Sequence, residues 1–270
     1  MNKLMVLAVL AAGLIFCSCG KTPTDEISEE EARERLLDQL KAEDKLYQDQ
    51  VIYSTNMGMN MTYSVWLPGG YDPEKTYPFL YLLHGYEYGD QSHLDRYWVQ
   101  KGNAQIIARD YVKGGGVPMV IVMPNGQSSF YSGKYEPYFE EELMAEVEKV
   151  YKCNGKRAIA GLSMGGFGTL LHALKYPSKF TYAYAMSPAV TGEMTDYVDA
   201  QADKGVFPAF TIEVGLQDTV VDNAAAEKLS DYLKENHISC EWVARDGVHD
   251  WVFWQACLPK ALKNIGESFK

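Results

Sequence analysis

Short apolar runs alternate with longer amphipathic stretches from about residue 51 to the end of the chain. The apolar runs predict strands at 51–53, 61–67, 79–83, 117–123, 157–160, 180–186, 210–214 and 240–244. The stretches between them predict helices at 99–112, 139–151, 164–176, 223–236 and 251–268. Strands that are apolar throughout are typical of a parallel sheet buried on both faces. Residues 51–270 are therefore predicted to form one α/β domain, with a doubly wound, mostly parallel sheet and helices on both faces.

The first 18 residues have the pattern of a signal peptide. Lys3 precedes an apolar run over residues 4–16, which is short for a membrane span, and Cys-Ser-Cys-Gly follows. The ending resembles a bacterial lipoprotein signal, with Ser18 before an acceptor cysteine, Cys19, although Phe16 and Cys17 depart from the usual pattern. The resemblance implies an exported protein that touches a membrane only through a lipid on Cys19. A plain secretory signal is the alternative.

Residues 19–50 are predicted to be a tether. The segment is charged throughout, and Ser28 followed by Glu31 has the spacing of a helix-capping box. Three leucines after this box form only a thin apolar stripe, so we expect a short, mostly solvated helix.

Charge and cysteine content narrow the possible partners. The chain has 270 residues, a formal net charge of -11 and a pI near 5.0, which disfavours nucleic acid as a partner. Beyond the leader, Cys153, Cys240 and Cys257 are too few and too widely spaced for a disulfide framework or a zinc site. The sequence shows no cofactor or metal motif, and it leaves the oligomeric state open.

A nucleophile motif follows the strand at 157–160. Residues 161–165 read Gly-Leu-Ser-Met-Gly, which fits Gly-x-Ser-x-Gly, and a predicted helix begins directly after Ser163. In this motif a sharp turn between strand and helix lifts the serine hydroxyl above the sheet, and the glycines let the two elements approach. The context predicts that Ser163 is a nucleophile.

A serine nucleophile needs a base, and three histidines follow it in the chain. His172 lies in the helix that starts at the motif and cannot fold back to Ser163, whereas His237 falls at a helix end. His249 follows the last strand, at the edge of the sheet where the nucleophile should lie. His249 is therefore the predicted general base.

The base needs an acid to orient it, and the loop after the strand at 210–214 offers two. Asp218 comes directly after this strand, while Asp222 is placed to cap the next helix. We predict Asp218 as the acid. The aspartates at 196, 199 and 203 precede the strand and would need a different loop geometry.

An acyl-transfer site also needs two donors for the oxyanion. The backbone N–H of Met164, next to the nucleophile, is the first candidate. The second is the N–H of Tyr86, in the loop after the strand at 79–83. His84 in the same loop is expected to order the loop rather than to act as a base.

Five motifs occur in this order: LYLLHGYEYGD, VIVMPNG, GLSMGG, VGLQD and GVHDWVFW. Together they resemble the esterase D group of the α/β hydrolases, and more narrowly the feruloyl and acetylxylan esterases of the first carbohydrate esterase family. The resemblance spans about residues 51–265. It implies a triad of Ser163, Asp218 and His249, an oxyanion hole of Tyr86 and Met164, no cofactor, and removal of feruloyl or acetyl groups from plant polysaccharide.

The substrate and the activity have alternatives. A general short-acyl esterase or thioesterase, such as an S-formylglutathione hydrolase, uses the same triad, and a non-catalytic carbohydrate-binding lipoprotein is the third possibility. The short stretch at 187–208 argues against a large lid. Aromatic residues near the predicted site could stack on a sugar or a phenolic acyl group; they are Tyr86, Tyr88, Tyr131, Tyr135, Tyr138, Trp251 and Trp254.

Overall fold

The computed structural model describes residues 30, 33–35, 42–201 and 206–270. The chain divides into two compact units, residues 1–40 and residues 41–270. The predicted signal peptide, the predicted lipid acceptor Cys19 and the predicted capping box of Ser28 and Glu31 lie outside the described residues. Among the described helices, none is both long and apolar enough to cross a membrane.

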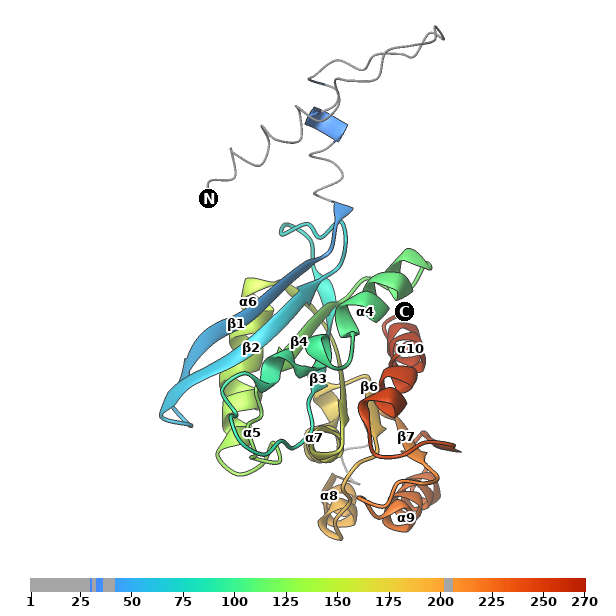
Figure 1. Cartoon of the computed structure of the whole chain (residues 1–270). Helices are drawn as coiled ribbons and strands as arrows, with labels where there is room; N and C mark the ends of the chain where they lie inside the picture. The colour runs from blue at the N-terminus through green and yellow to red at the C-terminus, as the bar shows by residue number, and fades with distance from the viewer. Residues whose placement is uncertain (1–29, 31–32, 36–41, 202–205) are drawn as a thin grey trace, which may run out of the picture. The chain divides into compact units, whose positions relative to one another are not determined.

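One eight-stranded sheet organises the larger unit (Figure 1). In spatial order the strands are β1-β2-β4-β3-β5-β6-β7-β8. Strand β2 pairs antiparallel with β1 and β4, and every other pair is parallel, which confirms the predicted mostly parallel sheet. The bounds are β1 (Lys45–Ser54), β2 (Met59–Leu67), β3 (Tyr77–Leu83), β4 (Val120–Pro124), β5 (Cys153–Leu162), β6 (Tyr182–Met186), β7 (Ala209–Gly215) and β8 (Cys240–Arg245).

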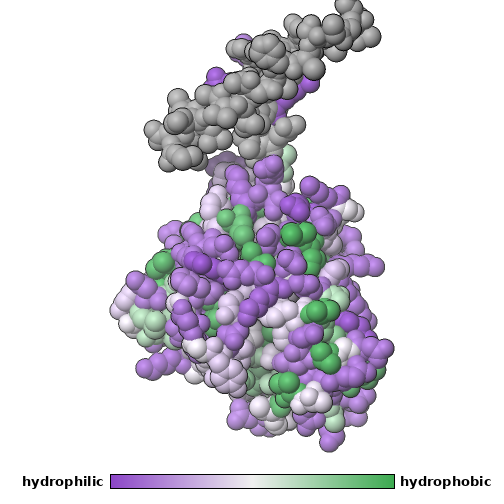
Figure 2. Space-filling view, viewed as in Figure 1, coloured by the Kyte–Doolittle hydropathy of each residue, from purple (hydrophilic) through white to green (hydrophobic). Residues whose placement is uncertain are grey.

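Helices cover both faces of this sheet. Side chains on β3 alternate between two cores: Tyr81 packs in the one that includes residues of α6, α7, α8 and α9, and Leu82 in the one that includes residues of α4 and α10. The visible surface is mostly hydrophilic, with small separate apolar areas (Figure 2). The helical segments are η2 (Leu94–Arg96), α3 (Tyr97–Gln100), α4 (Ala104–Lys113), α5 (Tyr135–Pro137), η3 (Tyr138–Leu143), α6 (Met144–Val150), α7 (Met164–Lys175), η4 (Pro177–Lys179), α8 (Glu193–Gln201), α9 (Asn223–Glu235) and α10 (Trp251–Ser268).

The sequence analysis placed the start of the sheet too late. Strand β1 begins at Lys45, so residues 45–50 belong to the sheet and not to the tether. This strand pairs only with β2, and a bulge between Tyr47 and Gln50 interrupts the pairing, with Asp49 at a positive φ of 51°. A polar edge strand with a bulge lacks the apolar run by which the other strands were predicted.

The helix predicted over 99–112 is divided into α3 and α4. The division falls at Gly102, where a side chain would lie 2.6 Å from the Trp98 ring and 3.0 Å from Trp251. Asn103 follows with φ of 51°, which a continuous helix does not allow. The sequence analysis also missed α8, which lies in the stretch expected to lack a lid.

The parallel strands bring distant loops to one edge of the sheet. Strands β3, β5, β7 and β8 run in the same direction, so the segments that follow them emerge at the same edge. These segments hold His84, Ser163, Asp218 and His249. The fold therefore gathers residues that are separated by more than 160 positions in the chain.

Candidate active site

Ser163 occupies a strained turn between β5 and α7. Its φ of 52° and ψ of -114° are rare for a residue with a side chain. The glycines on either side allow the segments to close: a side chain at Gly161 would lie 2.4 Å from the carbonyl oxygen of Gly165. A side chain at Gly165 would lie 2.5 Å from the carbonyl oxygen of Leu83 at the end of β3. This geometry presents the Ser163 side chain at the sheet edge.

The structure brings Ser163, His249 and Asp218 into one hydrogen-bonded chain. His249 Nε2 lies 2.9 Å from Ser163 Oγ, and His249 Nδ1 lies 2.7 Å from Asp218 Oδ2. The second oxygen of Asp218 accepts the backbone N–H of Val220 at 2.9 Å. The Asp218 side chain is fully buried, and that of His249 is 12% exposed. This arrangement allows a proton to move from Ser163 to His249 while Asp218 holds the imidazole.

The competing residues have other contacts. Asp222 caps α9, where its side chain accepts a backbone N–H in the first turn at 3.0 Å. His172 is fully buried and lies 2.6 Å from Glu140 Oε1 through Nδ1 and 2.9 Å from a backbone carbonyl through Nε2. His237 is exposed after α9. None of these three residues takes part in the hydrogen bonds that link Ser163, His249 and Asp218.

The backbone N–H groups of Met164 and Tyr86 are the predicted oxyanion donors. Met164 is the first residue of α7, so its N–H has no acceptor within the helix. A side chain at Gly85 would lie 3.5 Å from Ser163 Cβ, so the residue directly before Tyr86 is close to Ser163. No acceptor among the described residues binds either N–H.

Comparisons with known proteins agree with this geometry. A family model described as a putative esterase matches residues 54–265. The chain belongs to this esterase family. An endo-1,4-beta-xylanase/feruloyl esterase from Xylanibacter ruminicola is 27% identical over 237 residues, which cover 81% of the chain but only 31% of that relative. An acetyl esterase from Caldicellulosiruptor saccharolyticus is 27% identical over 229 residues, covering 68% of the chain and 81% of the relative.

The fold is also shared with solved esterase structures. A ferulic acid esterase superposes with a TM-score of 0.73 at 24% identity, over 84% of this chain and 99% of the other. At this identity the likeness shows the fold alone. Together with the sheet order, it identifies the α/β-hydrolase fold.

The aromatic residues of this esterase divide into a buried and an exposed set. Tyr131, Tyr135 and Tyr138 are each at most 1% exposed, so the expectation that they could contact a substrate is wrong. They pack edge to face against one another in the core beside α7. Trp254 is 6% exposed and packs edge to face against the His249 ring, with the ring centroids 4.9 Å apart, so it helps to hold this imidazole in place.

An aromatic cluster remains exposed near the predicted oxyanion hole. Tyr88 is 85% exposed and packs edge to face on Tyr86, and the Tyr86 ring lies 6.0 Å from Phe130. Phe130 in turn packs on Phe167, in the first turn of α7. The sequence analysis missed Phe130 and Phe167, because neither lies in a motif. This aromatic cluster of Tyr86, Tyr88, Phe130 and Phe167 offers an apolar surface between the loop after β3 and the first turn of α7.

One group among the described residues has the spacing of metal ligands. Ligand atoms of Asp49, His93 and Asp95 lie within 4.8 Å of one another. Arg96 Nε donates to Asp49 Oδ1 at 2.7 Å, and two hydroxyl groups on β2 donate to Asp95 at 2.9 and 2.6 Å. Arg96 already supplies the positive charge that a cation would bring. We therefore assign this group to the connection of β1 and β2 with η2.

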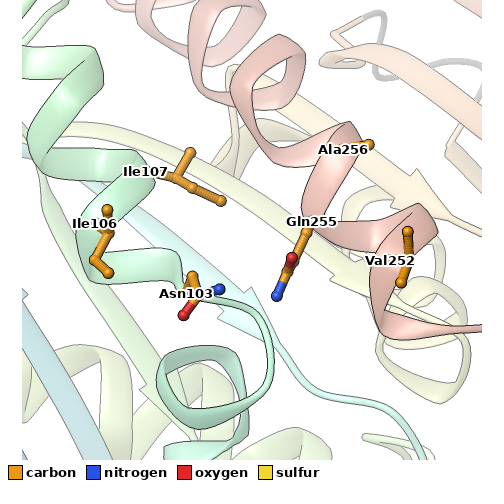
Figure 3. A pocket seen from close by; sticks show the side chains of 6 residues that line it. All are labelled: Asn103, Ile106, Ile107, Val252, Gln255 and Ala256. Atoms are coloured by element: carbon orange, nitrogen blue, oxygen red, sulfur yellow. The ribbon is translucent and has the colours of Figure 1, made fainter.

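A groove lies between α4 and α10 (Figure 3). Its volume is about 450 Å³, and Ile106 and Ile107 face Val252 and Ala256 across it. Gln255 at its side donates to a backbone carbonyl of the loop before α4 at 2.5 Å. The groove contains none of the predicted site residues.

His84 has a structural contact on each ring nitrogen. Its Nδ1 donates to the carbonyl of Gly85 at 2.7 Å, and its Nε2 accepts the N–H of Gly126 at 2.7 Å. These bonds require the neutral ring. Burial lowers the pKa of His84 to about 4 from its ordinary value of 6.5. His84 therefore ties the loop that carries Tyr86 to the end of β4, as the sequence analysis expected.

The low pKa of His84 predicts a loss of stability in acid. Below pH 6.5 the unfolded chain binds a proton at this histidine, but the folded protein does so only near pH 4. The His84 contribution should therefore fall by about 2 to 3 kcal/mol as the pH decreases from 7.5 to 4.5. Urea unfolding of the wild type and of His84→Gln at both pH values measures this, with exposed His237→Gln as the control. Equal acid sensitivity of all three proteins would contradict it.

Proposed function

We propose that this chain is a serine ester hydrolase that works through an acyl-enzyme and removes feruloyl or acetyl groups from plant polysaccharide. The observation that carries the proposal is the continuous hydrogen-bonded chain from Ser163 Oγ through His249 to Asp218. The esterase family model matches residues 54–265, which include Ser163, Asp218 and His249 and most of the sheet that supports them. Ester hydrolysis is the chemistry that this family and this geometry share.

In the first half of the cycle, His249 Nε2 accepts the proton of Ser163 as the oxygen attacks the ester carbonyl. The imidazolium that forms keeps its Nδ1–H bond to the buried carboxylate of Asp218, which stabilises the positive charge. His249 then gives the proton to the leaving alcohol. In the second half, His249 activates a water that hydrolyses the acyl group from Ser163.

The N–H groups of Met164 and Tyr86 are proposed to bind the oxyanion of both tetrahedral intermediates. Support comes from the place of Met164 next to Ser163, from the short distance between Gly85 and Ser163, and from the lack of another acceptor for either N–H among the described residues. Met164 also begins a 12-residue helix, whose N-terminal dipole favours negative charge at this point. Both donors are backbone groups, so their positions depend on the fold and not on a rotamer.

The aromatic cluster favours a substrate that carries an aromatic acyl group. Tyr86, which carries one proposed oxyanion donor, and Phe130 are 42% and 38% exposed, and their rings lie 6.0 Å apart. A phenolic ring could pack on such a surface through offset or edge-to-face contacts worth about 0.5–1.5 kcal/mol beyond burial. The two relatives described above are an endo-1,4-beta-xylanase/feruloyl esterase and an acetyl esterase. We favour the feruloyl group for this chain.

The deciding experiment compares substrates that differ in their acyl group, with one purified domain as the enzyme. The protein from residue 41 onward should hydrolyse methyl ferulate faster than acetylated xylan or a simple thioester, and Ser163→Ala should abolish all turnover. Release of ferulate and acetate is measured directly, and fluorophosphonate labelling of Ser163 reports the nucleophile without a substrate. Labelling without ferulate or acetate release would remove the plant-polysaccharide substrate but keep the hydrolase. A wild type that neither labels nor turns over would support a non-catalytic binding protein.

The two neighbouring aspartates should respond differently to substitution. Asp218→Asn should lower kcat by roughly 10³- to 10⁴-fold, because the amide cannot stabilise the imidazolium. Asp222→Ala should leave kcat unchanged and cost about 1 kcal/mol of stability through loss of the α9 cap. Initial rates on nitrophenyl acetate and urea unfolding of both variants separate the two roles. The assignment fails if kcat depends on Asp222 instead.

We further propose that the protein is exported and held at a membrane by a lipid on Cys19. The support is the sequence of the leader alone, in which Ser18 precedes Cys19 after an apolar run. The full chain, expressed in a bacterium, should move to the detergent phase, and Cys19→Ala should return it to the aqueous phase. Globomycin should block its processing. Unchanged processing under globomycin would instead indicate a plain secretory signal.

A further inference from the structure

Two exposed loops carry the acid and the base of the proposed site. We define the acid loop as residues 216–222, after β7, and the base loop as residues 246–250, after β8. The bond between Asp218 and His249 joins these loops at the site. In the part of the chain that the structure describes, every other hydrogen bond between the two loops is made by Gln217.

Gln217 contacts the base loop with three groups. Its backbone N–H donates to the carbonyl of Gly247 at 3.0 Å. Its side-chain carbonyl accepts the N–H of Gly247 at 2.8 Å, and its side-chain amide donates to Asp246 Oδ1 at 3.2 Å. Gln217 is thus hydrogen-bonded to both the N–H and the carbonyl of Gly247, two residues before His249.

The backbones of the two loops also touch at this point. A side chain at Gly215, which ends β7, would lie 2.4 Å from the carbonyl oxygen of Gly247. The side chain of Gln217 itself is exposed and touches the loops from the solvent side. Hydrogen bonds at such a position contribute little to global stability, because water can replace them. They do restrict the orientation of a short loop.

We propose that Gln217 is a positioning residue, which holds the base loop against the acid loop so that His249 stays aligned between Asp218 and Ser163. This inference rests on the proposed esterase function. Asp218 is next to Gln217 in the chain, so the same short segment that supplies the acid also fixes the base. Sequence reasoning included Gln217 in the VGLQD motif but gave it no role.

Alignment matters because His249 must transfer a proton in two directions during one cycle. Its Nε2 first faces Ser163 and then the leaving group or water, while Nδ1 keeps its bond to Asp218. A displacement of the ring by about 1 Å can cost a factor of about 100 in rate. Loss of the Gln217 side chain should allow part of this displacement, because its backbone N–H remains bound to Gly247.

The test introduces a negative charge at residue 217 to break its contact with Asp246, and then removes the charge at residue 246 to restore a contact. Gln217→Ala removes both side-chain bonds. Gln217→Glu keeps an acceptor for the N–H of Gly247 but places a carboxylate against Asp246, and the double variant Gln217→Glu/Asp246→Asn provides a new amide donor for that carboxylate. Asp246→Asn alone keeps an acceptor for Gln217 and is the matched control. Each protein is assayed for kcat and KM on nitrophenyl acetate and for its melting temperature.

We expect Gln217→Ala and Gln217→Glu to lower kcat about tenfold with KM within about twofold of the wild type. The melting temperatures should stay close to that of the wild type, and the double variant should recover most of the lost kcat. Wild-type kcat in Gln217→Ala, or no recovery in the double variant, would overturn the inference. A wild type without turnover or fluorophosphonate labelling would contradict the proposed function itself, and the positioning role with it.

Discussion

The close approach of three backbone segments around Ser163 is the constraint on which the site depends. Strand β5, the end of β3 and the first turn of α7 meet at Gly161 and Gly165, where side chains would collide with carbonyl oxygens. The positive φ of Ser163 costs of order 1–3 kcal/mol, which the surrounding packing must supply. The packing of helix α7 offsets this conformational cost, because the helix is buried along almost its whole length. Ser163, the N-terminus of α7 and the loop of Tyr86 are therefore brought together by one packing arrangement.

An ion pair between buried Glu213 and partly exposed Arg245 fixes the strands that precede the loops of Asp218 and His249. Glu213 on β7 accepts from Arg245 Nε at 2.5 Å, and Arg245 also donates to the carbonyl of Phe253 in α10 at 3.1 Å. Tyr184 on β6 donates to the second oxygen of Glu213. Desolvation of the buried Glu213 carboxylate offsets much of the attraction, so the pair contributes more to a defined geometry than to stability. Here the pair joins β7, β8 and α10 directly below the acid and base loops.

The surroundings give three histidines of this chain different chemistry. His84 is enclosed and both of its nitrogens are used by backbone groups, so it stays neutral and holds a loop. His172 is enclosed beside Glu140, which also binds Lys179, and it links α7 to η3. Only His249 combines partial exposure with a carboxylate on one side and a hydroxyl on the other. Residue type alone does not separate these roles.

The sequence by itself determined the alternation of strands and helices, the nucleophile motif and the choice of His249 and Asp218. Each of these depends on local patterns or on the order of elements, and a parallel sheet brings its strand ends to one edge whatever the details of packing. The polar edge strand β1, the break before α4 and the inward direction of Tyr131 depend on contacts with distant residues. The aromatic cluster and the bridge at Gln217 likewise exist only where separate loops meet. Tertiary structure decided them, because burial and hydrogen bonding at a loop are set by its neighbours in space.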